Sequence, residues 1–447
     1  MTQQSQQLDT SRPLRRIAQT WWPLAVSWLL MAIEGPAHSA VVARLVNPEV
    51  NLAAWGGIVY PIALIVESPV VMLLSASTAL SRHWRAYVKV RRISIALGAA
   101  FTVIHVLIAF TPFYDIVARD IIGAPAEIIE PGRIGLMIMT PWTFAIAYRR
   151  FQQGAMIRFG HTRSVGIGTA IRLTANGLVL LGGYLLQRIP GIVVASSAVV
   201  TGVVAEAVYV GLRMRPIARY QIHSAPRSGD PLTLRAFVAF YVPLALTSLI
   251  SFFVSPIGSA AMSRMPNALG SLAAWPVING LVFMLRSPGL AYSEVTVALL
   301  DEPETFRDLR RFATVLGVAL LALAALTVAT PLALLWLREV MAVPSDLVVL
   351  SRDALALSLL LPPLAVLQSW FQGVIVHSKR TRGITESVMV HFCLTALVLG
   401  VGVAARRLAG LHVTMMALEI ATLAQVGWLW YRSRPAVRAL ALTHKAQ

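Results

Sequence analysis

The sequence predicts an all-α integral membrane protein with twelve transmembrane helices, arranged as two six-helix bundles related by a pseudo-twofold axis. Three observations predict this fold. The 447 residues are 57% hydrophobic and only 13% charged, whereas charged residues make up about 25% of a soluble domain. Apolar stretches of about 20 residues, long enough to span the hydrocarbon core of a bilayer, recur along the whole chain. The second half of the chain also repeats the first half.

The repeat runs from end to end in one register, with a single slip. The offset between equivalent residues is 220 in the first part of each copy and 219 after the loss of one residue. Matching stretches are "PLA" at 23–25 and 243–245, "LAAW" at 52–55 and 272–275, and "RMRP" at 213–216 with "RSRP" at 432–435. We therefore expect two copies of one structural unit.

Each copy contains six candidate spans. In the first copy they lie near 17–43, 52–80, 93–113, 134–151, 164–186 and 190–212. In the second copy they lie near 237–262, 272–299, 312–335, 354–371, 384–404 and 413–431. Because six is an even number, both copies enter the membrane from the same side, and the axis that relates them runs along the membrane normal. We expect two bundles, 1–212 and 237–447, joined by a cytoplasmic linker at 213–236.

The basic residues predict the orientation of these spans. If the N-terminus is cytoplasmic, the inner segments hold 27 of the 38 Lys and Arg residues, and the outer loops hold nine. Cytoplasmic loops are enriched in Lys and Arg, so we expect both termini in the cytoplasm. The protein is then a multi-pass protein of the cytoplasmic (inner) membrane of the cell.

Several other functional classes find no support in the sequence. The net charge of +18 lies in short loops between apolar spans, which argues against a nucleic-acid partner. The single cysteine, Cys393, excludes an intramolecular disulfide. We find no phosphate-binding loop, no HExxH motif and no Cys/His cluster. We therefore expect no enzyme activity, no cofactor and no metal site.

Two parallel six-helix halves are typical of a transporter with a central site. The loop "SRHWRAYVKVRR" at 81–92 lacks the Gly and Asp of the major facilitator motif. The chain instead resembles the MATE-type multidrug and polysaccharide exporter superfamily, and within it the progressive ankylosis protein branch. The motifs that carry this resemblance are "IEGPAHSAVVARL" at 33–45, "RSPGLAYSEVTVALL" at 286–300 and "FQGVIVHSKRT" at 371–381.

The resemblance implies a MATE-like fold and a secondary-active, alternating-access exporter of an organic anion such as citrate, a nucleotide or a phosphate compound. Its partners would be the anionic substrate, a coupling proton or cation, and membrane lipids, and we expect a monomer. The alternative is a multidrug or lipid-linked oligosaccharide exporter of the same fold, which would need a more acidic or lipid-open cleft. A third possibility is a membrane scaffold without transport activity.

Charged residues inside the spans are the candidate site residues, because a charge at the helix centre costs about 2.5–3.5 kcal/mol. Glu67 and Arg286 hold equivalent positions before Ser-Pro in the second span of each half. Their opposite signs predict an ion pair that bridges the halves in one state and breaks in the other. The alternatives are a permanent structural pair, or two residues that each find partners within their own half.

Further cations could make the cleft attractive to an anion. Arg172 and His391 are equivalent at offset 219, and together with Arg286 they would bind a carboxylate or phosphate. The alternative for Arg172 is that it extends to the lipid headgroups. Glu294, whose counterpart is Ser75, would line the inner mouth of the cleft.

Glu34 is the candidate for ion coupling. Its counterpart in the second half is Val254, and an isolated carboxyl in a dry cleft could carry a proton. His38, one helical turn later, is its expected partner. The alternative is a carboxyl that bonds to the backbone of a broken helix. We expect Glu206 and Glu419 to be structural groups, since the sixth and twelfth spans lie more peripherally in the superfamily that the chain resembles.

Overall fold

The computed structural model describes residues 13–226, 232–300, 305–378 and 382–443. These residues form helices and no strand, as the composition predicts. The first half contains α1 (Pro13–Val42), α2 (Pro48–Ala54), α3 (Tyr60–Val71), α4 (Leu73–Leu80), α5 (Trp84–Phe110), α6 (Phe113–Asp115), α7 (Ala126–Arg158), α8 (Thr162–Leu186) and α9 (Gly191–Ile217).

The second half repeats this order. It contains α10 (Leu234–Ser263), α11 (Ala268–Leu290), α12 (Tyr292–Leu299), α13 (Thr305–Ala329), α14 (Leu332–Leu335), α15 (Val348–Ala356), α16 (Leu361–His377), α17 (Arg382–Ala405) and α18 (Gly410–Thr443). Short π-helical segments occur at η1 (Trp55–Val59), η2 (Ile116–Ile122), η3 (Ala218–Ile222) and η4 (Trp336–Val340), and a 3-10 turn occurs at η5 (Ser345–Leu347). The predicted linker begins inside α9, and its residues 227–231 lie outside the described part of the chain.

Eleven helical segments of the described residues are long and apolar enough to cross a membrane, and each coincides with a predicted span. The predicted fourth span corresponds to α7, which is 33 residues long but less apolar, because Glu127, Glu130, Arg133, Arg149, Arg150 and Arg158 lie within it. The multi-pass membrane protein is confirmed, and the count of twelve spans remains a prediction.

The repeat is visible in the backbone conformation as well as in the sequence. Non-glycine residues with positive φ are uncommon, yet each of those among the described residues has a repeat equivalent that also has a positive φ. The pairs are Asn47 (51°) with Asn267 (54°), Gln187 (52°) with Arg406 (48°), and Gly123 (71°) with Ala342 (48°). The two halves therefore share their turns as well as their helices.

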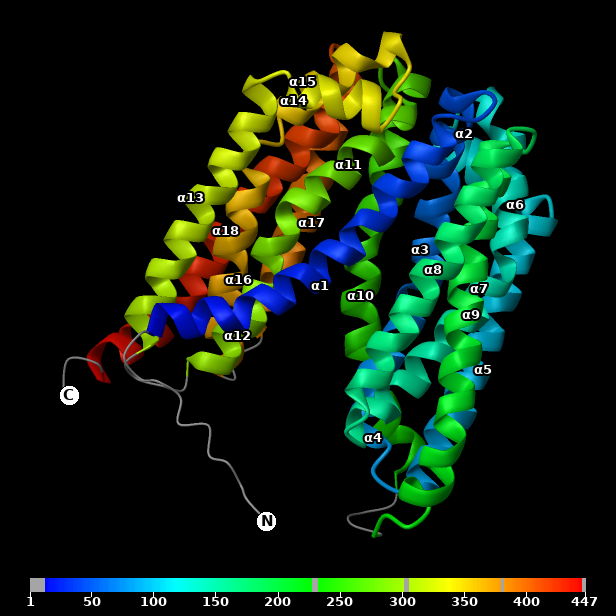
Figure 1. Ribbon diagram of the computed structural model, residues 1–447. Helices are drawn as coiled ribbons and strands as arrows, with labels where there is room; N and C mark the ends of the chain where they lie inside the picture. The colour runs from blue at the N-terminus through cyan, green and yellow to red at the C-terminus, as the bar shows by residue number, and fades with distance from the viewer. Residues whose placement is uncertain (1–12, 227–231, 301–304, 379–381, 444–447) are drawn as a thin grey trace.

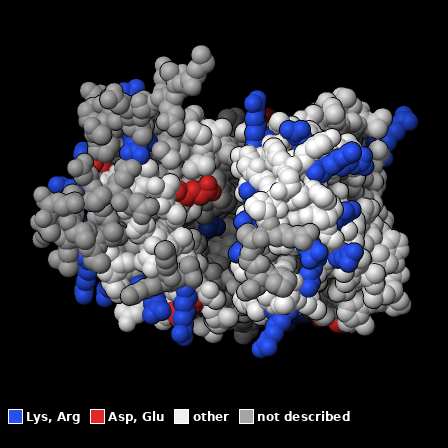
Figure 2. All heavy atoms as spheres, turned by 90° about the horizontal axis from the view of Figure 1, so that it is seen from below, with Lys and Arg blue, Asp and Glu red and all other residues white. Residues whose placement is uncertain are grey.

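The two halves form two lobes that meet at one end and diverge toward the other (Figure 1). α1 begins and α18 ends at the diverging end. Viewed from that end, a hollow separates the lobes, and many Lys and Arg side chains cover the surface (Figure 2). The expectation that this end faces the cytoplasm remains a prediction.

The first span of each half crosses to the other half. α1 packs along α11, and α10 packs along α3, so each second span is covered by the first span of the opposite copy. Both crossing helices contain two prolines, Pro23 and Pro36 in α1 and Pro243 and Pro256 in α10. A proline inside a helix removes one backbone hydrogen bond and permits a bend. Because each crossing helix packs on a span of the opposite half, these two helices link the lobes.

Candidate functional site

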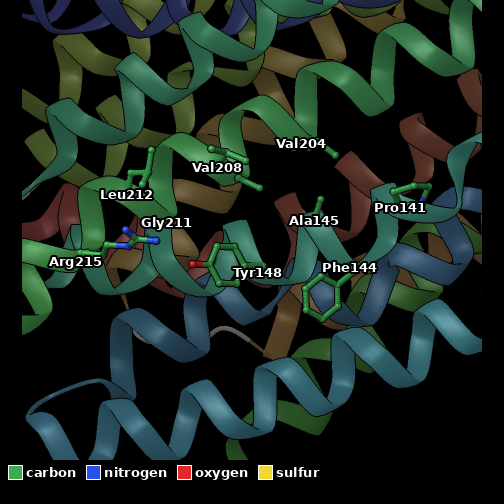
Figure 3. A pocket seen from close by; sticks show the side chains of 10 residues that line it. Pro141, Phe144, Ala145, Tyr148, Val204, Val208, Gly211, Leu212 and Arg215 are labelled. Atoms are coloured by element: carbon green, nitrogen blue, oxygen red, sulfur yellow. The ribbon is translucent and has the colours of Figure 1, made fainter.

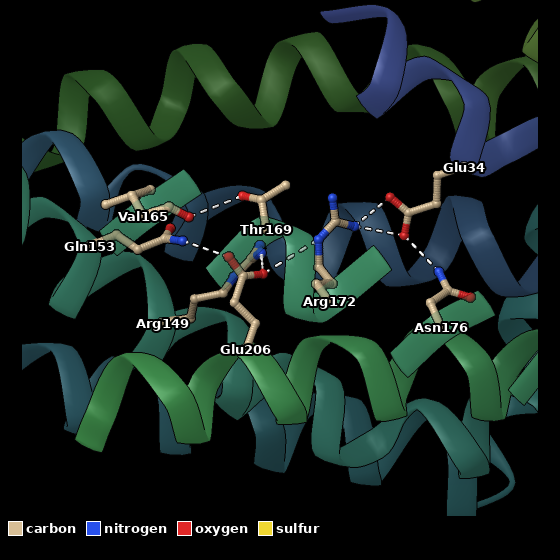
Figure 4. Close-up of polar contacts among 8 residues, drawn as sticks. All are labelled: Glu34, Arg149, Gln153, Val165, Thr169, Arg172, Asn176 and Glu206. Carbon is tan, nitrogen blue, oxygen red and sulfur yellow. Dashed lines mark hydrogen bonds and ion pairs between the residues drawn. The ribbon is translucent and has the colours of Figure 1, made fainter. Parts of the chain in front are cut away.

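Six polar side chains from four helices form a charged cluster inside the first half (Figure 4). Glu206 has no exposed surface, and the Glu34 and Arg172 side chains keep 19% and 13% of theirs. The cluster is therefore buried at one end and reaches accessible surface at the other. Its members are Glu34 of α1, Arg149 and Gln153 of α7, Arg172 and Asn176 of α8, and Glu206 of α9.

Glu206 lies at the centre of the charged cluster and contacts three of its members. The Arg149 guanidinium donates a hydrogen bond to its Oε2 atom. Gln153 Nε2 donates to Oε1 over 2.8 Å. Arg172 Nε lies 3.4 Å from Oε2. Two cations and one amide therefore compensate this buried carboxylate.

Arg172 also binds the second carboxylate of the charged cluster. Its Nη1 atom donates to Glu34 Oε1 over 2.6 Å and contacts Oε2 of the same carboxylate. Asn176 Nδ2 donates to Glu34 Oε1 over 2.8 Å. Glu34 is thus not the isolated carboxyl that we expected, because Arg172 neutralises it within the same lobe. Arg172 for its part binds protein carboxylates in this conformation and does not extend to lipid headgroups.

Helical spacing and close packing bring these groups together. Arg149 with Gln153, and Arg172 with Asn176, are four residues apart, so each pair occupies one face of its helix. α8 and α9 approach closely at Gly202, where a Cβ atom would lie 2.8 Å from the Arg172 carbonyl oxygen. The absence of a side chain at position 202 lets Arg172 and Glu206 face each other across the two helices.

His38 contacts Glu34 through the backbone and not through the carboxylate. Its Nδ1 atom lies 2.7 Å from the Glu34 carbonyl oxygen, so Nδ1 carries the proton of this hydrogen bond. The ring stacks on Trp55 with 5.9 Å between centroids. His38 is buried, and its Nε2 atom has no hydrogen-bond partner among the described residues.

Glu67 and Arg286 form no ion pair in this conformation, within the part of the chain that the structure describes. The cations that act electrostatically on Glu67 are Arg150, Arg149 and Arg172, all of the first half. Arg286 acts on His391 of its own half. Our first expectation, a bridging pair, is therefore not realised among the described residues of this conformation. The alternative of a partner within its own half does not describe Arg286 either, because no described carboxylate pairs with it.

The crossing helices explain the separation of these two charges. Tyr241 of α10 donates its hydroxyl to the Pro69 carbonyl over 2.7 Å. Trp21 of α1, at the equivalent position, donates its indole N–H to the Pro288 carbonyl over 2.9 Å. A helix from the other half thus covers each second span two residues after its charge.

The Ser-Pro motif has a structural role in both halves. A proline has no N–H for the carbonyl four residues earlier, which is Ile65 for Pro69 and Met284 for Pro288. The preceding serine supplies the missing donor. Ser68 Oγ donates to the Ile65 carbonyl over 2.8 Å, and Ser287 Oγ donates to the Met284 carbonyl over 2.8 Å. The second spans thereby tolerate a proline two residues after a charge.

The second half replaces the charged cluster by neutral residues. At offset 219, Gln368 stands for Arg149, Gln372 for Gln153, Gln425 for Glu206 and His391 for Arg172. Val254 stands for Glu34 at offset 220. The equivalent of the charged cluster in the second half therefore contains no carboxylate.

Arg286 consequently stands alone as a charged group on its helix. None of the described carboxylates forms an ion pair with it, and its Nε atom is buried without a hydrogen-bond partner. Gln368 Oε1 is also buried without a partner among the described residues. Glu294 is an exposed residue of α12 that accepts a hydrogen bond from Trp28 Nε1 over 3.3 Å. Among the described residues of the second half, Arg286 is thus a cation within a span that has no ion-pair partner.

An apolar groove lies on the first half, away from the predicted site residues. It has a volume of about 420 Å³ and runs between α7 and α9, with Phe144, Val208 and Leu212 among its lining residues (Figure 3). Tyr148 and Arg215 supply its polar atoms. None of the site residues that the sequence predicts lines this groove.

Sequence reasoning missed the centre of the charged cluster. We expected Glu206 to be a peripheral structural group, and Arg149 was counted only among the cytoplasmic basic residues. A signal was present in the sequence, since the repeat equivalents of Arg149 and Glu206 are two glutamines, Gln368 and Gln425. When two residues of opposite charge in one copy are both neutral in the other copy, the joint change indicates that the two charged residues contact each other.

Similar structures identify the fold. No protein-family model and no curated protein match the sequence. An inward-facing multidrug resistance MATE family transporter of the MOP superfamily has a TM-score of 0.72 and 15% identity, over 94% of this chain and 99% of that chain. The lipid II flippase MurJ in an inward closed conformation has a TM-score of 0.65 and 14% identity, over 95% and 90%.

An outward-facing multidrug resistance MATE family transporter has a lower TM-score of 0.63 and 16% identity, over 96% of both chains. At these identities the likeness concerns the fold alone. The resemblance to the progressive ankylosis branch remains a prediction. The chain has the fold of MATE-type transporters of the MOP superfamily.

Proposed function

We propose that the protein is a secondary-active, alternating-access membrane exporter of an organic anion, with Arg286 as the main anion-binding residue. One observation carries this proposal. Arg286 is a partly buried cation, with a buried Nε atom, that has no acidic partner among the described residues, whereas the arginines around Glu206 and Glu67 in the first half have carboxylates nearby. In that half, Glu34, Glu67 and Glu206 balance three arginines (Arg149, Arg150 and Arg172).

The chemistry of an arginine suits this role. Its guanidinium is always charged and binds carboxylate or phosphate through two parallel hydrogen bonds. An uncompensated charge at membrane depth is costly. An anion that binds at Arg286 would supply the negative charge that the protein itself does not provide there. His391, on which Arg286 acts electrostatically, would add to the attraction when protonated. Arg172 and Glu294 have protein partners in this state and are secondary candidates.

The hollow between the lobes supports the alternating-access mechanism. It opens at the end where α1 begins and where basic residues gather (Figures 1 and 2). With α7 as the twelfth span and both termini cytoplasmic, the structure represents an inward-open state. In the opposite state, after the substrate has left, Glu67 is the carboxylate that would approach Arg286 and close the pathway. The two bundles 1–212 and 237–447 would be the moving units.

The orientation predicts that both termini face the cytoplasm. Epitope tags at the N-terminus and the C-terminus should be inaccessible to antibody on intact cells or spheroplasts and accessible after permeabilisation, because the inner loops hold most basic residues. Labelling of either tag on sealed cells would contradict the orientation and, with it, the inward-open assignment.

The alternative substrate classes are separated by one uptake experiment. Proteoliposomes would be tested for uptake of radiolabelled citrate, malate and ATP and of a cationic dye. Uptake of at least one anion above that of empty liposomes is the expected result. Uptake of the dye alone would favour a multidrug exporter, and no uptake of any of the four would favour a lipid-linked substrate. The fold shared with a lipid II flippase supports this last alternative.

We propose Glu34 as the group that couples transport to protons, with His38 bonded to its backbone. Arg172 lies between two carboxylates, so protonation of Glu34 would leave Glu206 as its remaining partner. Glu34→Gln should therefore keep anion binding but abolish the acceleration of flux by a pH gradient. An unchanged response to the gradient in this variant would assign coupling to another group. Asn176→Ala, which removes one hydrogen bond but no charge, is the matched control.

A further inference from the structure

Two arginines connect the lobes at the end where the lobes meet. Arg44 follows α1, the crossing helix of the first half, and Arg264 is the C-cap of α10, the crossing helix of the second half. The two residues are equivalent at offset 220. By the orientation given above, they lie on the outer side, opposite to the opening of the hollow.

Arg264 reaches from the second half to the backbone of the first half. Its Nη1 atom donates to the Ile122 carbonyl over 2.6 Å. Its Nη2 atom donates to the Asp120 carbonyl over 3.0 Å and to the Ile121 carbonyl over 2.8 Å. Nη1 also donates to Ala260, four residues earlier on its own helix, over 2.8 Å. One guanidinium thus contacts three carbonyl groups of the opposite lobe.

Arg44 makes the reciprocal contact from the first half to the second. Its Nη2 atom donates to the Glu339 carbonyl over 2.6 Å, and Nη1 donates to the Val340 carbonyl over 2.9 Å. Nη1 also donates to Ala40 on its own helix over 2.8 Å. Glu339 and Val340 are the repeat equivalents of Asp120 and Ile121 at offset 219. The same contact therefore occurs twice, in opposite directions.

The acceptor carbonyls lie at the C-terminal ends of η2 and η4. The last carbonyls of a helix have no partner within it and carry the negative end of its dipole. A planar guanidinium with five donors can satisfy several of them at once. Gly123, with φ of 71°, leaves room for this approach, since a Cβ atom there would lie 3.1 Å from the Arg264 guanidinium carbon.

We propose that Arg44 and Arg264 form a reciprocal latch that holds the outer ends of the lobes together and stabilises the inward-open state. Opening of the outer face requires both arginines to release the carbonyls of the opposite lobe. The acceptor carbonyls are neutral, so the latch contains no ion pair. Water can therefore replace the hydrogen bonds of the arginines when the outer face opens. Its two arms are independent, and each one stabilises the closed outer face.

The test measures distances between the lobes and does not depend on the substrate. In a Cys393→Ser background, spin labels are placed at Leu186 and Val349 on the outer side, and at Tyr220 and Tyr431 on the inner side, all of which are exposed. Arg44→Gln with Arg264→Gln should lengthen the outer distance and shorten the inner one. Each arginine contributes charge-assisted hydrogen bonds, so we expect the ratio of states to shift about tenfold per arginine.

A second pair of outer arginines provides the control. Arg188 and Arg407 are equivalent at offset 219 and exposed, and their side chains form no hydrogen bond or ion pair with another described residue. Their change to Gln removes the same charge from the same face and should leave both distances as in the parent. If the latch variant folds and gives the parent distances, the latch is wrong. If it does not fold, the variant with Arg44→Lys and Arg264→Lys replaces it, since lysine keeps the charge but lacks the several N–H donors of the planar guanidinium. Parent distances in that variant would also overturn the proposal.

Discussion

Replacement of Glu206 by Gln should destabilise the protein more than replacement of Glu206 and Arg149 together. The single change leaves Arg149 buried without its carboxylate, and removal of one partner of a buried pair costs about 3–5 kcal/mol. The double change removes one positive and one negative charge, and Arg172 keeps Glu34. It also creates the two glutamines that the second half already has at Gln368 and Gln425.

Chemical or thermal unfolding in detergent of the parent, both single variants and the double variant measures this coupling. Glu386 and Arg432, which pair over 3.0 Å at a partly exposed site, are the matched control. Their coupling should stay below about 1 kcal/mol, as for exposed ion pairs. Additive effects of the two buried changes would contradict the charged cluster as described.

Arg286→Gln should weaken anion binding strongly while it leaves the stability nearly unchanged. Unlike Arg149, Arg286 has no carboxylate partner among the described residues that its loss would leave unpaired. Truncation of one member of a buried, hydrogen-bonded charge pair costs about 2–5 kcal/mol, so the dissociation constant for the anion should rise about 30-fold or more. Titration calorimetry with citrate and with ATP, on the purified parent and variant, gives the two constants.

Arg407→Gln is the control for this second prediction, because it removes an equal charge from an exposed position. It should bind citrate and ATP as the parent does. A variant at Arg286 that is less stable than the parent by several kcal/mol would reveal a structural partner, and our assignment of Arg286 would then be wrong.

The repeat allowed much of the fold to be predicted from the sequence. Eleven of the predicted spans overlap segments that are long and apolar enough to cross a membrane, with ends that differ by up to ten residues. The repeat also identified Glu67 with Arg286 and Arg172 with His391 as equivalent positions. Apolar length and the register of a repeat depend on the chain alone, so they are readable without coordinates. α7 was located too, although its charges make it the least apolar of the predicted spans.

The partners of the buried charges could not be predicted in the same way. Symmetry suggested that Glu67 and Arg286 meet, but Tyr241 and Trp21 show that each second span is covered by a crossing helix of the other half. The face that a helix presents depends on such packing. The contacts of Arg44 and Arg264 were invisible for another reason, since their acceptors are backbone carbonyls, which every residue has.

The most direct test of the central claim is the flux of an anion through the parent and the Arg286→Gln variant, side by side in proteoliposomes. Radiolabelled citrate and ATP would be supplied in parallel at equal protein density, with Arg407→Gln as the reference. The account predicts that the parent and the reference transport at least one of the two anions, and that the Arg286 variant, which is equally stable, does not. Equal flux through the parent and the Arg286 variant would contradict it.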